Sequence, residues 1–137
     1  MSELANKSNQ NLIGAEMLFK NNLHAPSIHC AYYSCLQKMC DILIESYGYS
    51  ADSLYSESSR NGIGSHEFII NKTFRNLTDK NNNHSESQQF KRQIEDFKRK
   101  RVDSDYKDSV IDYTKSSAAI AKKINSKLAQ VFNEEKK

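Results

Sequence analysis

Residues 26–47, PSIHCAYYSCLQKMCDILIESY, carry the clearest periodic pattern in the chain and decide its fold class. Apolar side chains recur from Ile28 to Ile42 at steps of four, three, four and three residues, the spacing of one face of an α-helix. Pro26 suits the first turn of such a helix, because its missing N–H would have no intrahelical partner there. The pattern predicts a helix buried in the core over roughly residues 26–47.

Helical spacing recurs on both sides of this segment. Together with a composition of one Pro, four Gly and no Trp, this spacing predicts an all-α domain. The 137 residues suffice for one domain but not for two of ordinary size. Residues 48–65, which are rich in Ser, Gly and Asn, are expected to form a long loop with room for one short turn. The expected helices span roughly residues 3–22, 26–47, 66–78, 87–101 and 106–133, and the long loop spans 48–65.

Composition and charge restrict the class of protein. A formal net charge of +3 is too small for a general nucleic-acid binder, so any such role depends on how the charges are distributed. No window approaches the ~20 apolar residues of a membrane span, and the N-terminal residues lack the pattern of a secretory signal. We therefore expect a cytoplasmic protein without a membrane partner.

Three cysteines, Cys30, Cys35 and Cys40, fall at five-residue steps in one predicted helix. Each step turns the helix by about 140° beyond a full turn, so the three thiols cannot share a face. We expect reduced, partly buried thiols rather than a disulfide framework or a shared metal site. No residue pattern indicates a cofactor.

The basic run in residues 98–106, KRKRVDSDY, contains one arginine that differs from its neighbours. Phe90, Ile94 and Phe97 form an apolar stripe at steps of four and three, and the next position on that stripe is Arg101. The three basic residues before Arg101 are expected to point mostly towards solvent. Arg101 is expected to continue the packed face.

A turn or kink is expected after Arg101, since Asp103, Ser104 and Asp105 are good N-cap residues for a following helix. Asp105 would then lie near Arg101 across the junction. In an unbroken helix the two residues are i and i+4, which also makes them neighbours. The pair would either clamp two helices together or hold a guanidinium that binds phosphate bidentately.

Residues 101–106, RVDSDY, resemble the R-x-x-A-D-Y signature of one branch of the HEPN family (higher eukaryote and prokaryote nucleotide-binding domains), with Ser104 where Ala is usual. Residues 27–43 are similar to the family's second-helix pattern, and residues 64–74 to its third helix, which places His66 at the characteristic histidine position. The resemblance implies an up-and-down bundle of four or five helices, usually dimeric, with the junction after the fourth helix at the dimer interface.

Many HEPN proteins are metal-independent ribonucleases with an R-x(4–6)-H motif, in which Arg steadies the scissile phosphate and His exchanges a proton with the 2′-hydroxyl. Residues 102–108 contain no His, and a carboxylate beside an arginine holds a proton poorly. A base would have to come from His66, His29 or His24, through the fold or from a second protomer.

The missing histidine favours an RNA- or nucleotide-binding or regulatory module, as one component of a prokaryotic defence or toxin–antitoxin system with an operon partner such as a nucleotidyltransferase. The alternatives are a metal-independent endoribonuclease and a purely structural helical bundle. Each candidate residue also has a structural explanation, such as helix capping, core packing or a solvated charged face. The candidate catalytic residues are Arg101, Asp105 and His66, and the candidate ligand contacts are Arg101, Tyr106, Lys98, Lys107 and Tyr33.

Overall fold

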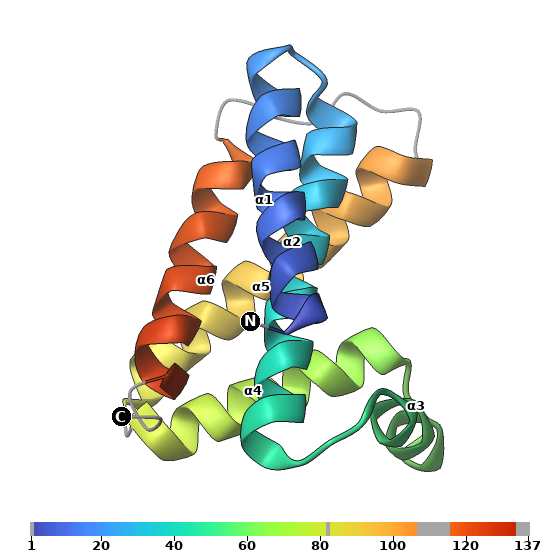
Figure 1. The fold of residues 1–137 in the computed structure, drawn as a ribbon, viewed down its shortest axis with the longest axis vertical. Coiled ribbons are helices and arrows are strands. Elements are labelled where there is room, and N and C mark those ends of the chain that lie inside the picture. Colours follow the sequence, from blue (N-terminus) through green and yellow to red (C-terminus); the bar gives the residue numbers. More distant parts are fainter. Residues whose placement is uncertain (1, 82, 107–115, 134–137) are drawn as a thin grey trace.

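A computed structural model describes residues 2–81, 83–106 and 116–133, and over these ranges it contains helices and no strand. This confirms the all-α prediction for the described part of the chain. There it forms six helices rather than the expected five (Figure 1): α1 Glu3–Lys20, α2 His24–Tyr47, α3 Ala51–Arg60, α4 Ser65–Asn81, α5 His84–Tyr106 and α6 Ser117–Asn133.

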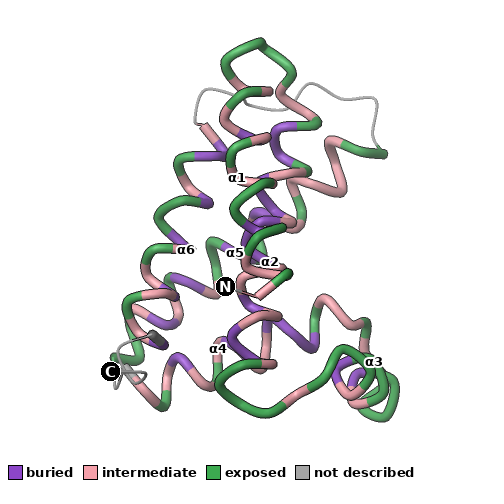
Figure 2. The backbone as a smooth tube through the Cα atoms, in the orientation of Figure 1, coloured by how far each residue is buried: buried purple, intermediate pink, exposed green. Residues whose placement is uncertain are grey.

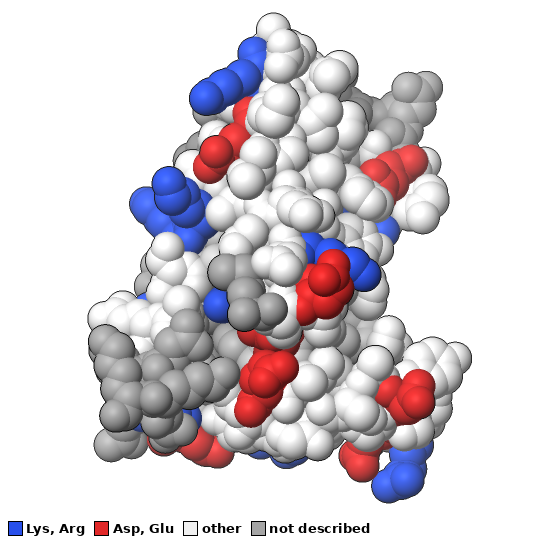
Figure 3. Space-filling model, viewed as in Figure 1, with Lys and Arg blue, Asp and Glu red and all other residues white. Residues whose placement is uncertain are grey.

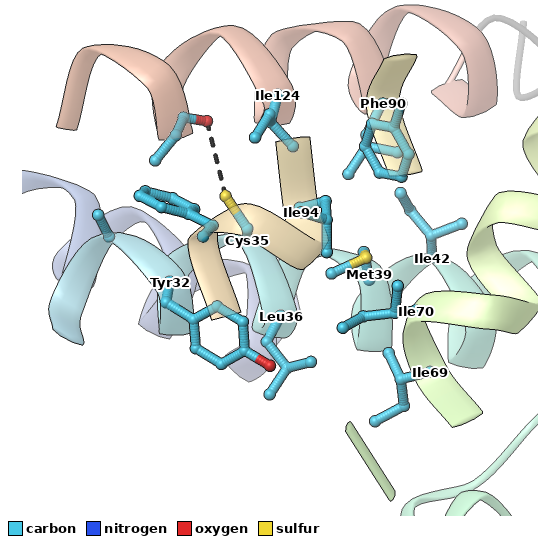
Figure 4. Close-up of a cluster of buried hydrophobic side chains, with 14 of the residues drawn as sticks. Tyr32, Cys35, Leu36, Met39, Ile42, Ile69, Ile70, Phe90, Ile94 and Ile124 are labelled. Atoms are coloured by element: carbon cyan, nitrogen blue, oxygen red, sulfur yellow. Dashed lines mark hydrogen bonds between the residues drawn. The ribbon is translucent and has the colours of Figure 1, made fainter. Parts of the chain in front are cut away.

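Helix α2 is the centre of the fold. It forms an antiparallel hairpin with α1 and also contacts α4, α5 and α6 (Figure 1). The predicted stripe from Ile28 to Ile42 is buried along its whole length, and buried positions face inward on the surrounding helices (Figure 2). Figure 4 shows Met39 and Ile42 of α2 beside residues from the neighbouring helices, among them Ile70, Ile94 and Ile124.

Small polar side chains join α1, α2 and α6 inside the bundle. The Ser8 hydroxyl donates to the Ser34 carbonyl oxygen at 2.7 Å, and the Ser34 hydroxyl donates to the Ser8 carbonyl oxygen at 2.8 Å. The Asn125 side-chain amide donates to Ser34 Oγ at 2.9 Å. Because buried polar groups need partners, these bonds favour one register of α1 and α6 along α2.

The prediction of a long loop over residues 48–65 is wrong, because α3 occupies Ala51–Arg60. Gly48, with φ of 74°, ends α2 in the left-handed conformation that glycine adopts without strain. Ser50 and Ser53 then form a reciprocal capping box at the start of α3. Leu54 is the one buried apolar side chain of this helix, so the sequence carries almost no apolar stripe there.

The prediction of a turn or kink after Arg101 is also wrong. Helix α5 runs unbroken through Arg101 to Tyr106, so Tyr106 ends α5 instead of opening the last helix. The gap left between the expected helices over residues 66–78 and 87–101 is mostly helical too, since α4 extends to Asn81 and α5 begins at His84. Asn83 caps α5, because its side-chain oxygen accepts a hydrogen bond from Glu86 N at 3.1 Å. Residues 107–115, where the last helix was expected to begin, lie outside the described residues.

Candidate functional site

Side chains from three helices meet where α5 crosses α2 near the start of α4. Arg101 continues the buried stripe of Phe90, Ile94 and Phe97 and therefore faces α2 rather than solvent. Asp105 lies one turn further along the same face. We use the name Arg101 cluster for the six residues that gather here: Arg101 and Asp105 of α5, His29, Tyr32 and Tyr33 of α2, and His66 of α4.

The Arg101 guanidinium lies against aromatic rings and is largely withdrawn from water. Its side chain is 12% exposed, and its central carbon is 5.4 Å from the ring centre of Tyr32 and 5.7 Å from that of Tyr33. Cation–π contacts of this kind are stronger when water is excluded. Nη1 is 3.5 Å from Asp105 Oδ2, whereas the buried Nε has no hydrogen-bond partner among the described residues. The guanidinium is thus held in place with donor capacity unused.

His29 supplies the imidazole that the sequence around Arg101 lacks. Its Nδ1 is 3.0 Å from Asp105 Oδ2, the same oxygen that faces Arg101, and its ring stacks at 4.7 Å on the ring of Tyr33. When Nδ1–H donates to the carboxylate, Nε2 of the neutral ring is left as a proton acceptor. The His29 side chain is 46% exposed, so solvent and ligands can reach this ring.

His66 occupies the other side of the Arg101 cluster. Its Nδ1 is 3.2 Å from the hydroxyl of Tyr32, a residue with no exposed surface. Burial lowers the pKa of His66, and the positive charges of Arg101 and Lys98 lower it further. Burial also raises the pKa of the Tyr32 hydroxyl, against the opposing effect of Arg101. Near neutral pH the Tyr32 hydroxyl is therefore protonated and donates to a neutral His66.

The lowered pKa of His66 predicts a pH dependence of stability. Protonation is easier in the unfolded chain, whose histidine pKa is about 6.5, than in the folded protein. The contribution of neutral His66 is therefore present above that pH and is lost as pH falls through the folded-state value. We expect urea unfolding to show lower stability at acid pH, by less in His66→Gln than in the wild type.

A histidine NMR titration separates the causes of this shift. The titration midpoint of His66 should stay low in Arg101→Lys, which keeps the positive charge, and should rise in Arg101→Gln. After burial, the charge of Arg101 is the largest cause of the lowered His66 pKa. Arg99→Gln, two residues away on an exposed side chain, is the matched control and should leave the midpoint unchanged. A His66 midpoint at or above the ordinary histidine value would contradict the prediction.

The structure brings four predicted site residues together: Arg101, Asp105, His66 and Tyr33. Lys98 is near enough to lower the pKa of His66. Tyr106 is 77% exposed at the end of α5 and is not among the residues that contact Arg101 in the described part of the chain. Lys107 lies outside the described residues.

Sequence reasoning gave no definite role to two members of the Arg101 cluster. His29 was one of three histidines named as a possible base, and Tyr32 was expected only to pack in the core. Tyr32 does pack there, but its hydroxyl reaches His66. His29 is three and four residues from the two tyrosines, which places the three rings on one side of α2. His24 instead packs edge-on against Phe19 at 5.1 Å.

The remaining basic residues of the run do not form a surface of one charge. Arg99 is 71% exposed, as expected, and pairs with Asp96, which also lies 3.2 Å from Lys100. Acidic and basic side chains alternate over the face of the molecule seen in Figure 3. Recognition of an anion therefore depends on local geometry rather than on a broad positive field.

The cysteines and carboxylates do not form a metal site in the described ranges, where no three His, Cys, Asp or Glu side chains group together suitably. All three cysteines are free thiols, and burial, with a smaller effect from Asp41, raises the pKa of Cys40 to about 11. Over the same ranges, no helix has the length and apolar character needed to cross a bilayer.

Comparison of the chain with protein-family models, curated proteins and solved structures finds no match. Function therefore has to be inferred from the Arg101 cluster itself. Chemically, it combines a fixed cation, a carboxylate-bound imidazole and a second, neutral imidazole. Such a set can bind a phosphate and can move a proton next to it without a metal ion.

Proposed function

We propose that the chain is a HEPN-like module that binds RNA or a nucleotide through a phosphate at Arg101. The proposal includes a homodimer that acts with an operon partner, such as a nucleotidyltransferase, in a prokaryotic defence or toxin–antitoxin system. The observation that carries it is the state of Arg101, which is 12% exposed, lies against two tyrosine rings and has one carboxylate as its ion-pair partner among the described residues.

Stability alone is a weak reason to bury an arginine. Replacing a buried ion pair with apolar side chains of similar volume is often neutral or stabilising, because it avoids the cost of desolvating the charges. A guanidinium, in contrast, presents a rigid fork of donors that matches two phosphate oxygens. Lys98 adds a second positive charge nearby, so Arg101 and Lys98 outweigh the single carboxylate of Asp105.

A second candidate function, metal-independent RNA cleavage, is favoured by the His29–Asp105 contact of 3.0 Å. In this reaction His29 Nε2 takes the proton of a 2′-hydroxyl, and Asp105 stabilises the imidazolium that results. The 2′-oxygen bonds to phosphorus while the bond from phosphorus to the 5′-oxygen breaks. The imidazolium returns its proton to the 5′-oxygen, and Arg101 offsets the negative charge on the phosphoryl oxygens. The products are a 2′,3′-cyclic phosphate and a 5′-hydroxyl.

One experiment tests both functions. Fluorescent single-stranded RNA is incubated with the full chain in EDTA, and binding is followed by anisotropy and cleavage on a denaturing gel. We expect Arg101→Lys to weaken binding at least tenfold, because Lys keeps the charge but loses the bidentate fork. We expect His29→Asn to leave binding within about twofold and to reduce any cleavage by about 100-fold or more. Arg99→Lys, on the exposed side of the same helix, is the matched control.

The outcomes separate the possibilities. Equal RNA affinity for wild type and Arg101→Lys would refute the binding proposal. The remaining alternative would then be a purely structural helical bundle. If RNA is bound but stays intact, the ribonuclease function is excluded and the binding function is supported. Cleavage that persists in His29→Asn would show that another group, such as His66 or a contaminating nuclease, is responsible.

A further inference from the structure

Arg101 and His66 share two aromatic walls. The central carbon of the Arg101 guanidinium is 5.4 Å from the ring centre of Tyr32 and 5.7 Å from that of Tyr33. The His66 ring centre is 5.8 Å and 5.7 Å from the same two ring centres. The two tyrosine rings therefore position a permanent cation next to a group that becomes a cation only when it is protonated.

His66 has cationic neighbours and no acidic partner in the described part of the chain. The carboxylate of the Arg101 cluster, Asp105, is instead shared by His29 at 3.0 Å and Arg101 at 3.5 Å. Burial lowers the pKa of His66, and the charges of Arg101 and Lys98 lower it further. An imidazolium at His66 therefore stands beside two positive charges and lacks a counter-ion.

The other surroundings of His66 do not compensate for these charges. From α2 it meets the neutral rings of Tyr32 and Tyr33. Glu67, the next residue of α4, is exposed and lies on another side of the helix, because consecutive helical residues do not face each other. The charged side chains of α3 and α6, which also pack on α4, are not among the causes of the lowered His66 pKa. A bound anion can supply the counter-ion that these described residues do not.

The hydrogen bond to Tyr32 allows His66 to gain a proton without a change in packing. Nδ1 of the neutral ring accepts from the Tyr32 hydroxyl at 3.2 Å, so the ring proton lies on Nε2. A second proton enters at Nδ1, which then donates to the Tyr32 oxygen. Because a hydroxyl both donates and accepts, the contact is made in both protonation states, and only the hydroxyl hydrogen has to turn.

We propose that a dianion, such as a terminal phosphate, binds beside Arg101 together with a proton on His66. The inference rests on the proposed function, since it needs an anion at Arg101. The bound dianion offsets the charges of Arg101 and Lys98 and gives the imidazolium its counter-ion. Affinity for the dianion therefore rises as pH falls through the His66 midpoint. A phosphodiester inside an RNA strand has a single negative charge and favours the proton less.

The test uses sulfate, which keeps two negative charges where histidine titrates, whereas a phosphate monoester loses one near pH ~6. The histidine signals of the full chain are followed by NMR against pH, in sodium sulfate and in sodium chloride of equal ionic strength. We expect sulfate to raise the His66 midpoint by at least about 0.5 pH units. By linkage, the Kd for sulfate should fall about threefold or more between a pH above both midpoints and a pH below both.

Histidine variants assign the proton. His66→Gln should bind sulfate with an affinity that no longer depends on pH in this way. His84→Gln, at the exposed start of α5, is the matched control and should keep the wild-type dependence. A pH dependence that survives in His66→Gln but is lost in His29→Gln would place the proton on His29 and overturn the proposal.

Two further arms separate the charge of the ligand from its place of binding. Dimethyl phosphate, a monoanion, should raise the His66 midpoint less than half as far as sulfate, and an equal rise would contradict a dianion site. If sulfate does not bind, or binds Arg101→Gln as tightly as the wild type, the proposed function fails and this inference fails with it. If sulfate binding depends on Arg101 while the His66 midpoint is the same in sulfate and chloride, the coupling to His66 alone is wrong.

Discussion

An Arg101→Ala variant should lose about 3 kcal/mol of its free energy of unfolding, the scale observed when one partner of a buried ion pair is removed. Arg101 is 12% exposed, so its loss leaves a space beside Tyr32 and Tyr33 and takes a positive charge from Asp105. Urea unfolding at pH 7.5 measures the change. The matched control is Arg99→Ala, whose side chain is 71% exposed and which should cost less than ~0.5 kcal/mol.

Arg101→Met then separates function from packing. Methionine fills much of the same space without a charge, so we expect it to recover more than half of the stability lost in Arg101→Ala. RNA binding should not recover, because the phosphate-binding fork is absent. Similar losses in Arg101→Ala and Arg99→Ala would show that the guanidinium contributes little to packing. RNA binding by Arg101→Met at wild-type affinity would show that its charge is not used.

Helix α2 was predictable because its apolar stripe is long and regular, and every member of that stripe is buried. Helix α3 was not predictable from periodicity, since it buries one apolar side chain, Leu54, and depends on the serine caps at its start. The end of α5 was misjudged for a related reason. Asp103 and Ser104 have a local preference for N-cap positions, but in the folded chain they continue the helix.

The position of Arg101 followed from the sequence, because one stripe with Phe90, Ile94 and Phe97 fixes the direction in which it points. The contact between Asp105 and His29 did not follow from the sequence. His29 is 76 residues away along the chain, and no local pattern connects two positions so far apart. The contact depends on how α5 crosses α2, which is a property of the packed core.

Tyr32 connects the Arg101 cluster to that core. It is fully buried and lies among the core side chains (Figure 4). Its ring lies under the Arg101 guanidinium, and its hydroxyl reaches His66. The aromatic face and the hydroxyl are thus used at the same time. The position of α5 on α2 therefore sets the geometry of Arg101, and changes in the core below it should alter the site.

An Ile94→Ala variant should test this dependence and should lose about 3 kcal/mol of stability, within the range of about 2–5 kcal/mol for such truncations in a core. Ile94 has no exposed surface and lies between α2 and α6, near Met39 and Ile124 (Figure 4). Ile94→Val removes one methylene and should cost about 1 kcal/mol. The control is Ile13→Ala on α1, where a side chain 57% exposed should contribute less than ~0.5 kcal/mol.

The same variants show whether the core sets the position of Arg101. Ile94 is seven residues, or about two helical turns, before Arg101 on the same face of α5. If truncation lets α5 shift on α2, the guanidinium moves relative to His66, and the low His66 midpoint in the NMR titration should change in Ile94→Ala but not in Ile13→Ala. An unchanged midpoint in Ile94→Ala, despite the loss of stability, would mean that Tyr32, Tyr33 and Asp105 hold Arg101 in place without support from the core beneath it.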